Sequence, residues 1–161
     1  MKTKSLIPLA VLLLITAGCG KKTSYQTSKG GVTIEQKGDT VTMDYKDKAG
    51  GMKVVANDKG VALPATFPKD IPLFKDSLVD VANTMADTMT MHTTFKAPWQ
   101  EAMQFYADKL KAEGWKVDSV MNLGDNGLVV AKKDTRQCSV MLTKDGDHSV
   151  AQIMLTGLPI K

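Results

Sequence analysis

Apolar side chains recur with a helical period between Pro98 and Trp115. They fall at i, i+3, i+4, i+7 and i+11, at Trp99, Ala102, Met103, Tyr106 and Leu110. Because ~3.6 residues make one helical turn, this spacing predicts one amphipathic helix of about four turns. Pro98 suits the first helical position, where its missing N–H needs no partner, and Gly114 suits the left-handed residue that ends a helix.

Alternating apolar and polar positions on both sides of this helix predict strands. We expect two strands before the helix and four after it, at residues 78–82, 88–95, 115–121, 127–131, 138–142 and 150–155. Turn residues at Asn126-Gly127 and Asp145-Gly146 favour antiparallel connections. Residues 61–161 are therefore predicted to form an α+β domain of order ββαββββ, an antiparallel β-sheet with one principal helix packed on a face.

A small β hairpin region is predicted at residues 31–60, before this domain. Residues 32–35 and 41–45 alternate around Lys37-Gly38-Asp39, and a third short strand follows at residues 52–55. One face of these strands carries valine, isoleucine and methionine. The other face is polar and is expected to be solvated; it carries Thr33, Glu35, Thr42, Asp44 and Lys53.

Prolines interrupt the chain between Leu63 and Phe74, which excludes a helix or a central strand there. Because Phe67 and Ile71 interleave with these prolines, we expect the segment to wrap the domain. A polyproline II recognition motif is the alternative. The last strands carry apolar residues on both faces, which predicts a second cover from the hairpin region, the proline segment or a second copy of the chain.

Residues 1–18 have the pattern of a secretory leader. Two lysines precede an apolar run at residues 6–15, and small residues precede Cys19. The run is shorter than the ~20 residues that a membrane-spanning helix needs. The end of the leader resembles the lipobox of bacterial lipoproteins, because Ala17, Gly18 and Cys19 match it, while Thr16 stands where leucine is usual.

This resemblance implies cleavage before Cys19 and acyl lipids on that cysteine, which would anchor the protein without a transmembrane helix. An ordinary secreted protein is the alternative. Gly20 follows Cys19, where retention at the inner membrane of enteric bacteria requires aspartate. In a Gram-negative host the resemblance therefore implies the outer membrane, facing the periplasm. Residues 19–30 are mostly polar and are predicted to be a lipidated, flexible tether.

Charge and composition exclude few functions. Loss of Lys2 and Lys4 with the leader would reduce the formal net charge from +4 to +2. Of the 21 cationic residues only Arg136 is an arginine, and the lysines are scattered, so we expect no nucleic-acid partner. Cys138 lies among strand residues and is predicted to be a small buried side chain rather than a nucleophile.

A second resemblance involves the proline segment and the helix. Phe67-Pro68-Lys69-Asp70-Ile71-Pro72, Phe105-Tyr106 and Gly114-Trp115 resemble an FPxDxP…FY…GW pattern of uncharacterised bacterial envelope lipoproteins. The similarity covers roughly residues 60–156. It implies an α+β domain facing the periplasm or the cell exterior, and it carries over no catalytic residue.

A methionine-rich strand is the most specific chemical feature. Met85, Met89, Met91 and His92 supply the soft ligands that Cu(I) prefers, and Cys138 would suit the same ion. Core packing is the competing interpretation, because Met89 and Met91 share a face with Phe95 while His92 points the other way.

The aromatic residues of the helix offer further candidates. Trp99, Trp115, Phe105 and Tyr106 would either line a ligand groove or pack in the core. Phe105 falls outside the main stripe and is a candidate partner surface. Neither His92 nor His148 has an identifiable catalytic partner in the sequence, and we expect no enzyme activity.

The predicted function is accordingly a non-enzymatic lipoprotein of the cell envelope. It would bind an envelope protein, a ligand or a second copy of itself at the membrane surface. No cofactor is expected besides the acyl lipid on Cys19, and periplasmic Cu(I) binding remains the alternative.

Overall fold

The computed structural model describes residues 20–28, 30–47 and 50–159. The expected leader and Cys19 lie outside these residues. Within them, ten strands form one antiparallel sheet, and one helix packs on it. The elements are β1 (Lys21–Thr27), β2 (Gly30–Lys37), β3 (Thr40–Asp47), β4 (Gly50–Ala56), β5 (Leu78–Met85), β6 (Thr88–Phe95), α1 (Trp99–Ala112), β7 (Lys116–Asn122), β8 (Asn126–Lys133), β9 (Arg136–Asp145) and β10 (His148–Thr156). The structure thus confirms a mostly antiparallel sheet with one helix.

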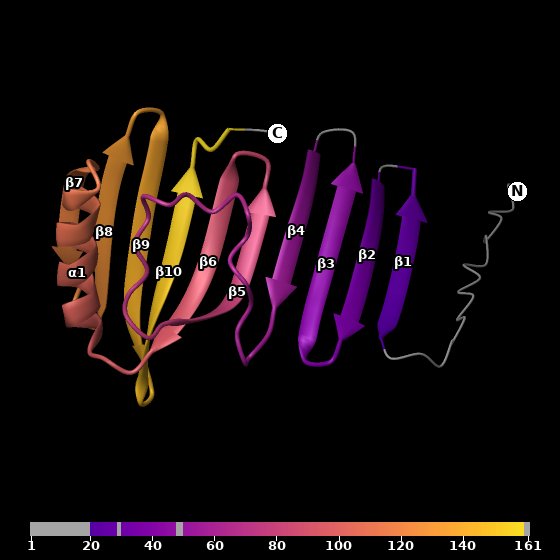
Figure 1. The fold of residues 1–161 in the computed structure, drawn as a ribbon, viewed down its shortest axis with the longest axis horizontal. Helices are drawn as coiled ribbons and strands as arrows, with labels where there is room; N and C mark the ends of the chain where they lie inside the picture. The colour runs from indigo at the N-terminus through magenta and orange to yellow at the C-terminus, as the bar shows by residue number, and fades with distance from the viewer. Residues whose placement is uncertain (1–19, 29, 48–49, 160–161) are drawn as a thin grey trace, which may run out of the picture.

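The sheet has the order β1-β2-β3-β4-β5-β6-β10-β9-β8-β7 (Figure 1). The strands after the helix form the predicted meander, and β10 joins it to β6. Because β4 pairs with β5, residues 31–60 continue the sheet and are not a separate region in front of it. Sequence patterns locate strands but do not reveal such a long-range pairing. No helix in the described part of the chain is long and apolar enough to cross a membrane.

Strand β1 lies where a flexible tether was expected. It pairs with β2 along its whole length, from Lys21 opposite Gln36 to Thr27 opposite Gly30. All of its residues are exposed, so composition alone did not indicate a strand. Pairing with β2 satisfies backbone groups of this polar segment, and Ser24 and Thr33 add a side-chain hydrogen bond of 3.1 Å.

Helix α1 has the predicted buried stripe. Trp99, Ala102, Tyr106, Ala107 and Leu110 are buried, and Met103 is half-buried. Pro98 is the N-cap rather than the first helical residue, because its ψ of 137° is extended. Gly114 ends the helix as predicted, with φ +83°. The N–H groups of Gly114 and Trp115 donate to Lys111 and Leu110, which satisfies two of the last carbonyls.

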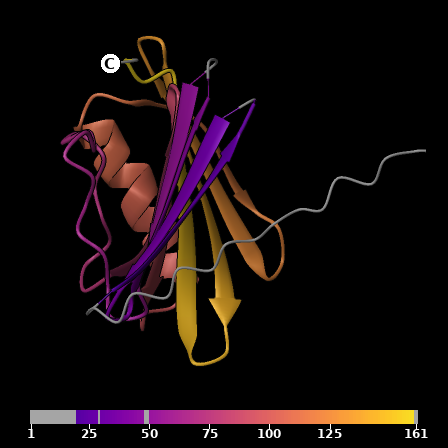
Figure 2. The same ribbon diagram turned by 90° about the vertical axis from the view of Figure 1, so that its right-hand side faces the viewer.

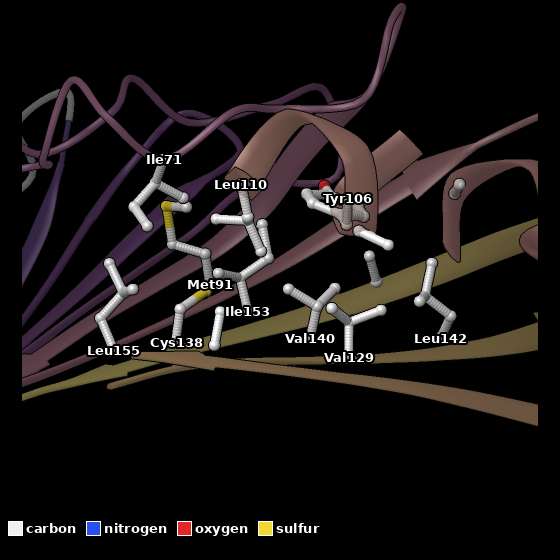
Figure 3. Packing of buried hydrophobic residues seen from close by; sticks show 14 of the residues in the cluster. Ile71, Met91, Tyr106, Leu110, Val129, Cys138, Val140, Leu142, Ile153 and Leu155 are labelled. Atoms are coloured by element: carbon white, nitrogen blue, oxygen red, sulfur yellow. The ribbon is translucent and has the colours of Figure 1, made fainter. Parts of the chain in front are cut away.

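The core lies between α1 and strands β6 and β8–β10 (Figure 3). Tyr106 and Leu110 of the helix point toward Val129, Val140 and Ile153 of the sheet. The helix packs closely on the sheet at Gly127 in β8, where an added Cβ would lie 2.7 Å from the Trp99 ring. Glycine is therefore required for this contact.

The proline segment wraps the domain on the same side of the sheet as α1 (Figure 2). Ile71 is buried in the core, and Phe74 packs against Phe95 with ring centroids 4.8 Å apart. These contacts confirm the expected wrapping. We call this side of the sheet the helix face and the opposite side the outer face.

Apolar side chains line the helix face of the sheet from β5 onward, but they line the outer face in β2–β4. The apolar side of the sheet therefore changes between β4 and β5. Directly paired residues point to the same face, so one row can be followed across the sheet. On the helix face this row runs Val129, Val140, Ile153, Met91, Ala82 and then Val55, Thr42, Glu35, Lys22. The row beside it on the outer face runs Asn83, Val54, Met43, Ile34, Thr23. The valine, isoleucine and methionine face of β2–β4 is therefore the outer face.

Candidate binding groove

Asp70 fixes the proline segment to the turn between β8 and β9. Its carboxylate accepts hydrogen bonds from both terminal nitrogens of Arg136, at 3.0 and 2.8 Å, and from Lys133 Nζ at 2.9 Å. These charge-assisted bonds hold the pKa of Asp70 at about 2 although partial burial opposes them. Lys133 Nζ also donates to the Glu113 carbonyl at 2.7 Å, which links the end of α1 to the same cluster.

Trp115 completes this cluster. Its Nε1 donates to the Asp70 carbonyl at 3.0 Å, and the Arg136 guanidinium lies 4.8 Å from the centre of its ring. Asp70 of the FPxDxP pattern and Trp115 of the GW pattern are therefore in contact. Their shared structural role is to hold the proline segment against the sheet.

The first part of the proline segment borders a groove on the helix face of β3–β5. Its volume is about 1310 Å³. Most of its lining is apolar, and the apolar side chains include Val55, Val61, Leu63, Pro64, Ala82, Met89 and Leu158. Polar side chains contribute Thr42, Asp44, Lys46, Lys53, Thr84 and Arg136. A concave, mainly apolar surface with a few polar groups is typical of a small-molecule site.

Backbone hydrogen bonds fix the walls of this groove. The Val61 N–H donates to the Val79 carbonyl at 2.7 Å, which attaches the proline side of the groove to β5. At the other end, the Leu158 N–H donates to the Asp87 carbonyl at 2.9 Å. Asp70 and Arg136 hold the rest of the proline segment, so contacts within the chain fix the walls of the groove.

The aromatic residues of the helix pack in the core and do not line this groove. Trp99, Tyr106 and Trp115 are buried. Burial raises the pKa of Tyr106 to about 12, and its Oη accepts the Phe74 N–H at 3.3 Å. Phe105 is half-buried and packs edge-on against Phe74, with ring centroids 5.2 Å apart. A partner surface at Phe105 remains a prediction, although this contact already occupies part of its ring.

The residues considered for Cu(I) do not converge. Met89 and Met91 are buried on the helix face, whereas His92 and the exposed Met85 lie on the outer face. Cys138 is buried in the core, and burial raises the pKa of its thiol to about 12. In the described residues, no group of three or more histidine, cysteine or acidic side chains could hold a metal ion. The geometry favours core packing for Met89 and Met91.

His92 has a carboxylate partner that the sequence did not reveal. Asp80 accepts a hydrogen bond from Thr94 at 2.9 Å, and its other oxygen lies 2.6 Å from His92 Nδ1. The pairing of β5 with β6 shifts between Val79 and Val81, and this irregularity leaves Asp80 opposite no single residue. A local break in register cannot be read from alternation. His148 is exposed at the start of β10.

The comparison with known families concerns the part of the chain that carries α1. Residues 78–149, from β5 to the first residues of β10, match a family described as START domain-like. The matched stretch contains the helix and most of the strands that form the core, but not β1–β4 or the proline segment. No curated protein and no solved structure matches the chain. Over residues 78–149 the chain is thus similar to the START domain-like family.

Proposed function

We propose that this protein is a lipid-anchored module of the bacterial cell envelope that binds a mainly apolar ligand without catalysing a reaction. The lipobox resemblance at Cys19 supports the anchor. In this proposal the groove between the proline segment and β3–β5 is the binding site, and β1, which begins two residues after Cys19, joins the sheet to the membrane. In a Gram-negative host the module would face the periplasm from the outer membrane.

The groove bordered by the proline segment is the observation that carries the binding proposal. Its volume of about 1310 Å³ would hold a ligand of acyl-chain or drug size. Its apolar lining includes Val55, Val61 and Leu63, and burial of apolar ligand surface against these side chains would supply the free energy of binding. Lys46 and Lys53 at its polar side would orient a polar end group of the ligand.

A fluorescent apolar probe, N-phenyl-1-naphthylamine, tests this proposal. The full chain should bind the probe saturably and enhance its emission. Thr84 lines the groove on β5, so the larger side chain of Thr84→Trp should narrow the groove and weaken binding of the probe. Met85→Trp is the matched control, because Met85 follows on the same strand, points to the outer face and is exposed.

The two variants separate a groove from nonspecific binding. Saturable binding of equal affinity by the wild-type chain and by Met85→Trp, with weaker binding by Thr84→Trp, would support the proposal. Equal affinity in all three chains would place the probe elsewhere and would contradict it. Circular dichroism of each variant would verify that the sheet is intact.

A further inference from the structure

The outer face of β1–β3 exposes apolar side chains that no part of the described chain covers. Tyr25, Ile34 and Val41 are 52%, 37% and 40% exposed. They come from three adjacent strands and share one face with the half-buried Val32 and Met43. Contiguous apolar surface of this kind marks a site of association with a protein or a membrane.

The helix face of the same strands is polar. It has a hollow of about 610 Å³ whose lining includes Lys22, Glu35 and Asp44. These strands are therefore amphipathic, and their apolar side is the one that α1 and the proline segment do not cover. A sheet of this pattern requires a second apolar surface on its outer face.

The expected anchor at Cys19 is only two residues from this surface along the chain. Only Gly20 separates Cys19 from β1, so covalent geometry limits the distance between the Cα atoms of Cys19 and Lys21 to about 7 Å. The ten-residue tether that the composition suggested would have allowed the sheet to stand away from the bilayer. A strand that begins beside the anchor holds β1–β3 at the membrane surface.

Charge along the outer face agrees with this placement. Lys21 lies at the end of the face next to the anchor, opposite Gln36. Asp47 lies at the far end, where its carboxylate accepts a hydrogen bond from Tyr45 at 2.9 Å. Between them the outer face of β1–β3, within the described residues, carries no charged side chain. The face therefore presents an uncharged stretch to a bilayer, and its cation Lys21 lies beside the expected anchor, where it can contact lipid phosphates.

We propose that the outer face of β1–β3 lies on the lipid bilayer, with Tyr25, Ile34 and Val41 in the interfacial region. This orientation rests on the proposed anchor at Cys19. The anchor confines the face to the bilayer surface at high effective concentration, so a modest apolar area suffices for stable contact. Tyrosine is well suited to such an interface because its ring is apolar and its hydroxyl is polar. The helix face and its groove would then be directed away from the membrane.

Labels on adjacent residues of one strand test this orientation. Ile34→Cys and Glu35→Cys carry the label on opposite faces of β2, and Val41→Cys and Thr42→Cys repeat the comparison on β3. Each full-length, lipidated chain would be labelled with a nitrobenzoxadiazole maleimide. It would then be reconstituted into vesicles of phosphatidylethanolamine and phosphatidylglycerol, with and without nitroxide-labelled lipid. Mass spectrometry of each preparation would first establish the lipid on Cys19.

We expect blue-shifted emission and several-fold stronger nitroxide quenching at positions 34 and 41 than at positions 35 and 42. Equal quenching at all four positions would overturn the orientation while leaving the anchor intact. Emission at positions 34 and 41 that is typical of a label in water would do the same. Blue-shifted emission that nitroxide lipid does not quench, and that disappears on dilution of the protein in the vesicles, would assign the face to a second copy. It would thereby overturn the membrane contact. A chain without lipid on Cys19 would overturn the proposed anchor as well.

Discussion

The Asp70 carboxylate holds the Arg136 guanidinium through two hydrogen bonds of 2.8 and 3.0 Å, although 66 residues separate them in the sequence. Both side chains are largely shielded, with 21% and 19% of their surfaces exposed. The pair closes the proline segment over the sheet, and the groove depends on that segment for one wall.

Asp70→Asn should destabilise the protein by about 2 kcal/mol at neutral pH, because the folded-state pKa is lowered from 3.8 to about 2. A lowered pKa means that the stabilisation is fully present above the unfolded value of 3.8 and disappears as the pH falls toward 2. Urea unfolding across this range should show a steep loss of stability in the wild-type chain and a shallower one in the variant. Asp58→Asn, an exposed loop position, is the control. Parallel pH profiles for the wild type and Asp70→Asn would refute the role of this pair.

Gly127→Ala should cost about 1–3 kcal/mol of stability through overpacking. The new methyl group would lie 2.7 Å from the Trp99 ring and 2.8 Å from Met103 Sδ. Adding Met103→Ala should recover part of the loss, because the methionine side chain would no longer oppose the methyl group. Thermal unfolding of the two single variants and the double variant measures this coupling. Strictly additive effects would show that α1 does not pack on β8 as described.

Cys138 should resist thiol reagents in the folded protein. Burial raises the pKa of its thiol to about 12, so the reactive thiolate is almost absent at mildly alkaline pH. In a Cys19→Ser chain, reaction with Ellman's reagent should occur only as fast as the core opens, and urea should accelerate it. Met141→Cys adds an exposed thiol to the same strand and should react at once. If the Cys19→Ser chain without Met141→Cys reacted equally rapidly, this result would contradict the buried position of Cys138.

The sequence predicted the helix and the strands around it because their side chains repeat with the periods of regular structure. Gly38 and Gly146 likewise mark turns with positive φ. Other turns place Ala86 and Asp134 at φ 49° and 55°, and no glycine signals them. Local patterns therefore recover the elements whose residue types match their geometry.

The remaining features depend on contacts between distant segments. Strand β1 has no buried residue, so only its pairing with β2 identifies it. The reversal of the apolar face follows from the pairing of β4 with β5. This pairing determines which of the two faces of the hairpin strands continues the face that contains Ala82. In the groove region, the sequence marks Asp70 as part of a motif but does not indicate its partners Lys133 and Arg136. Sequence order contains no signal for such a long-range ion pair.

The anchor at Cys19 is the claim on which both the membrane location and the orientation of the sheet depend. Intact mass spectrometry of the protein purified from its native membrane tests it most directly. The account predicts a chain that begins at Cys19 and carries the added mass of a diacylglyceryl group and an amide-linked acyl chain. A chain that retains residues 1–18, or one with an unmodified thiol at Cys19, would contradict it.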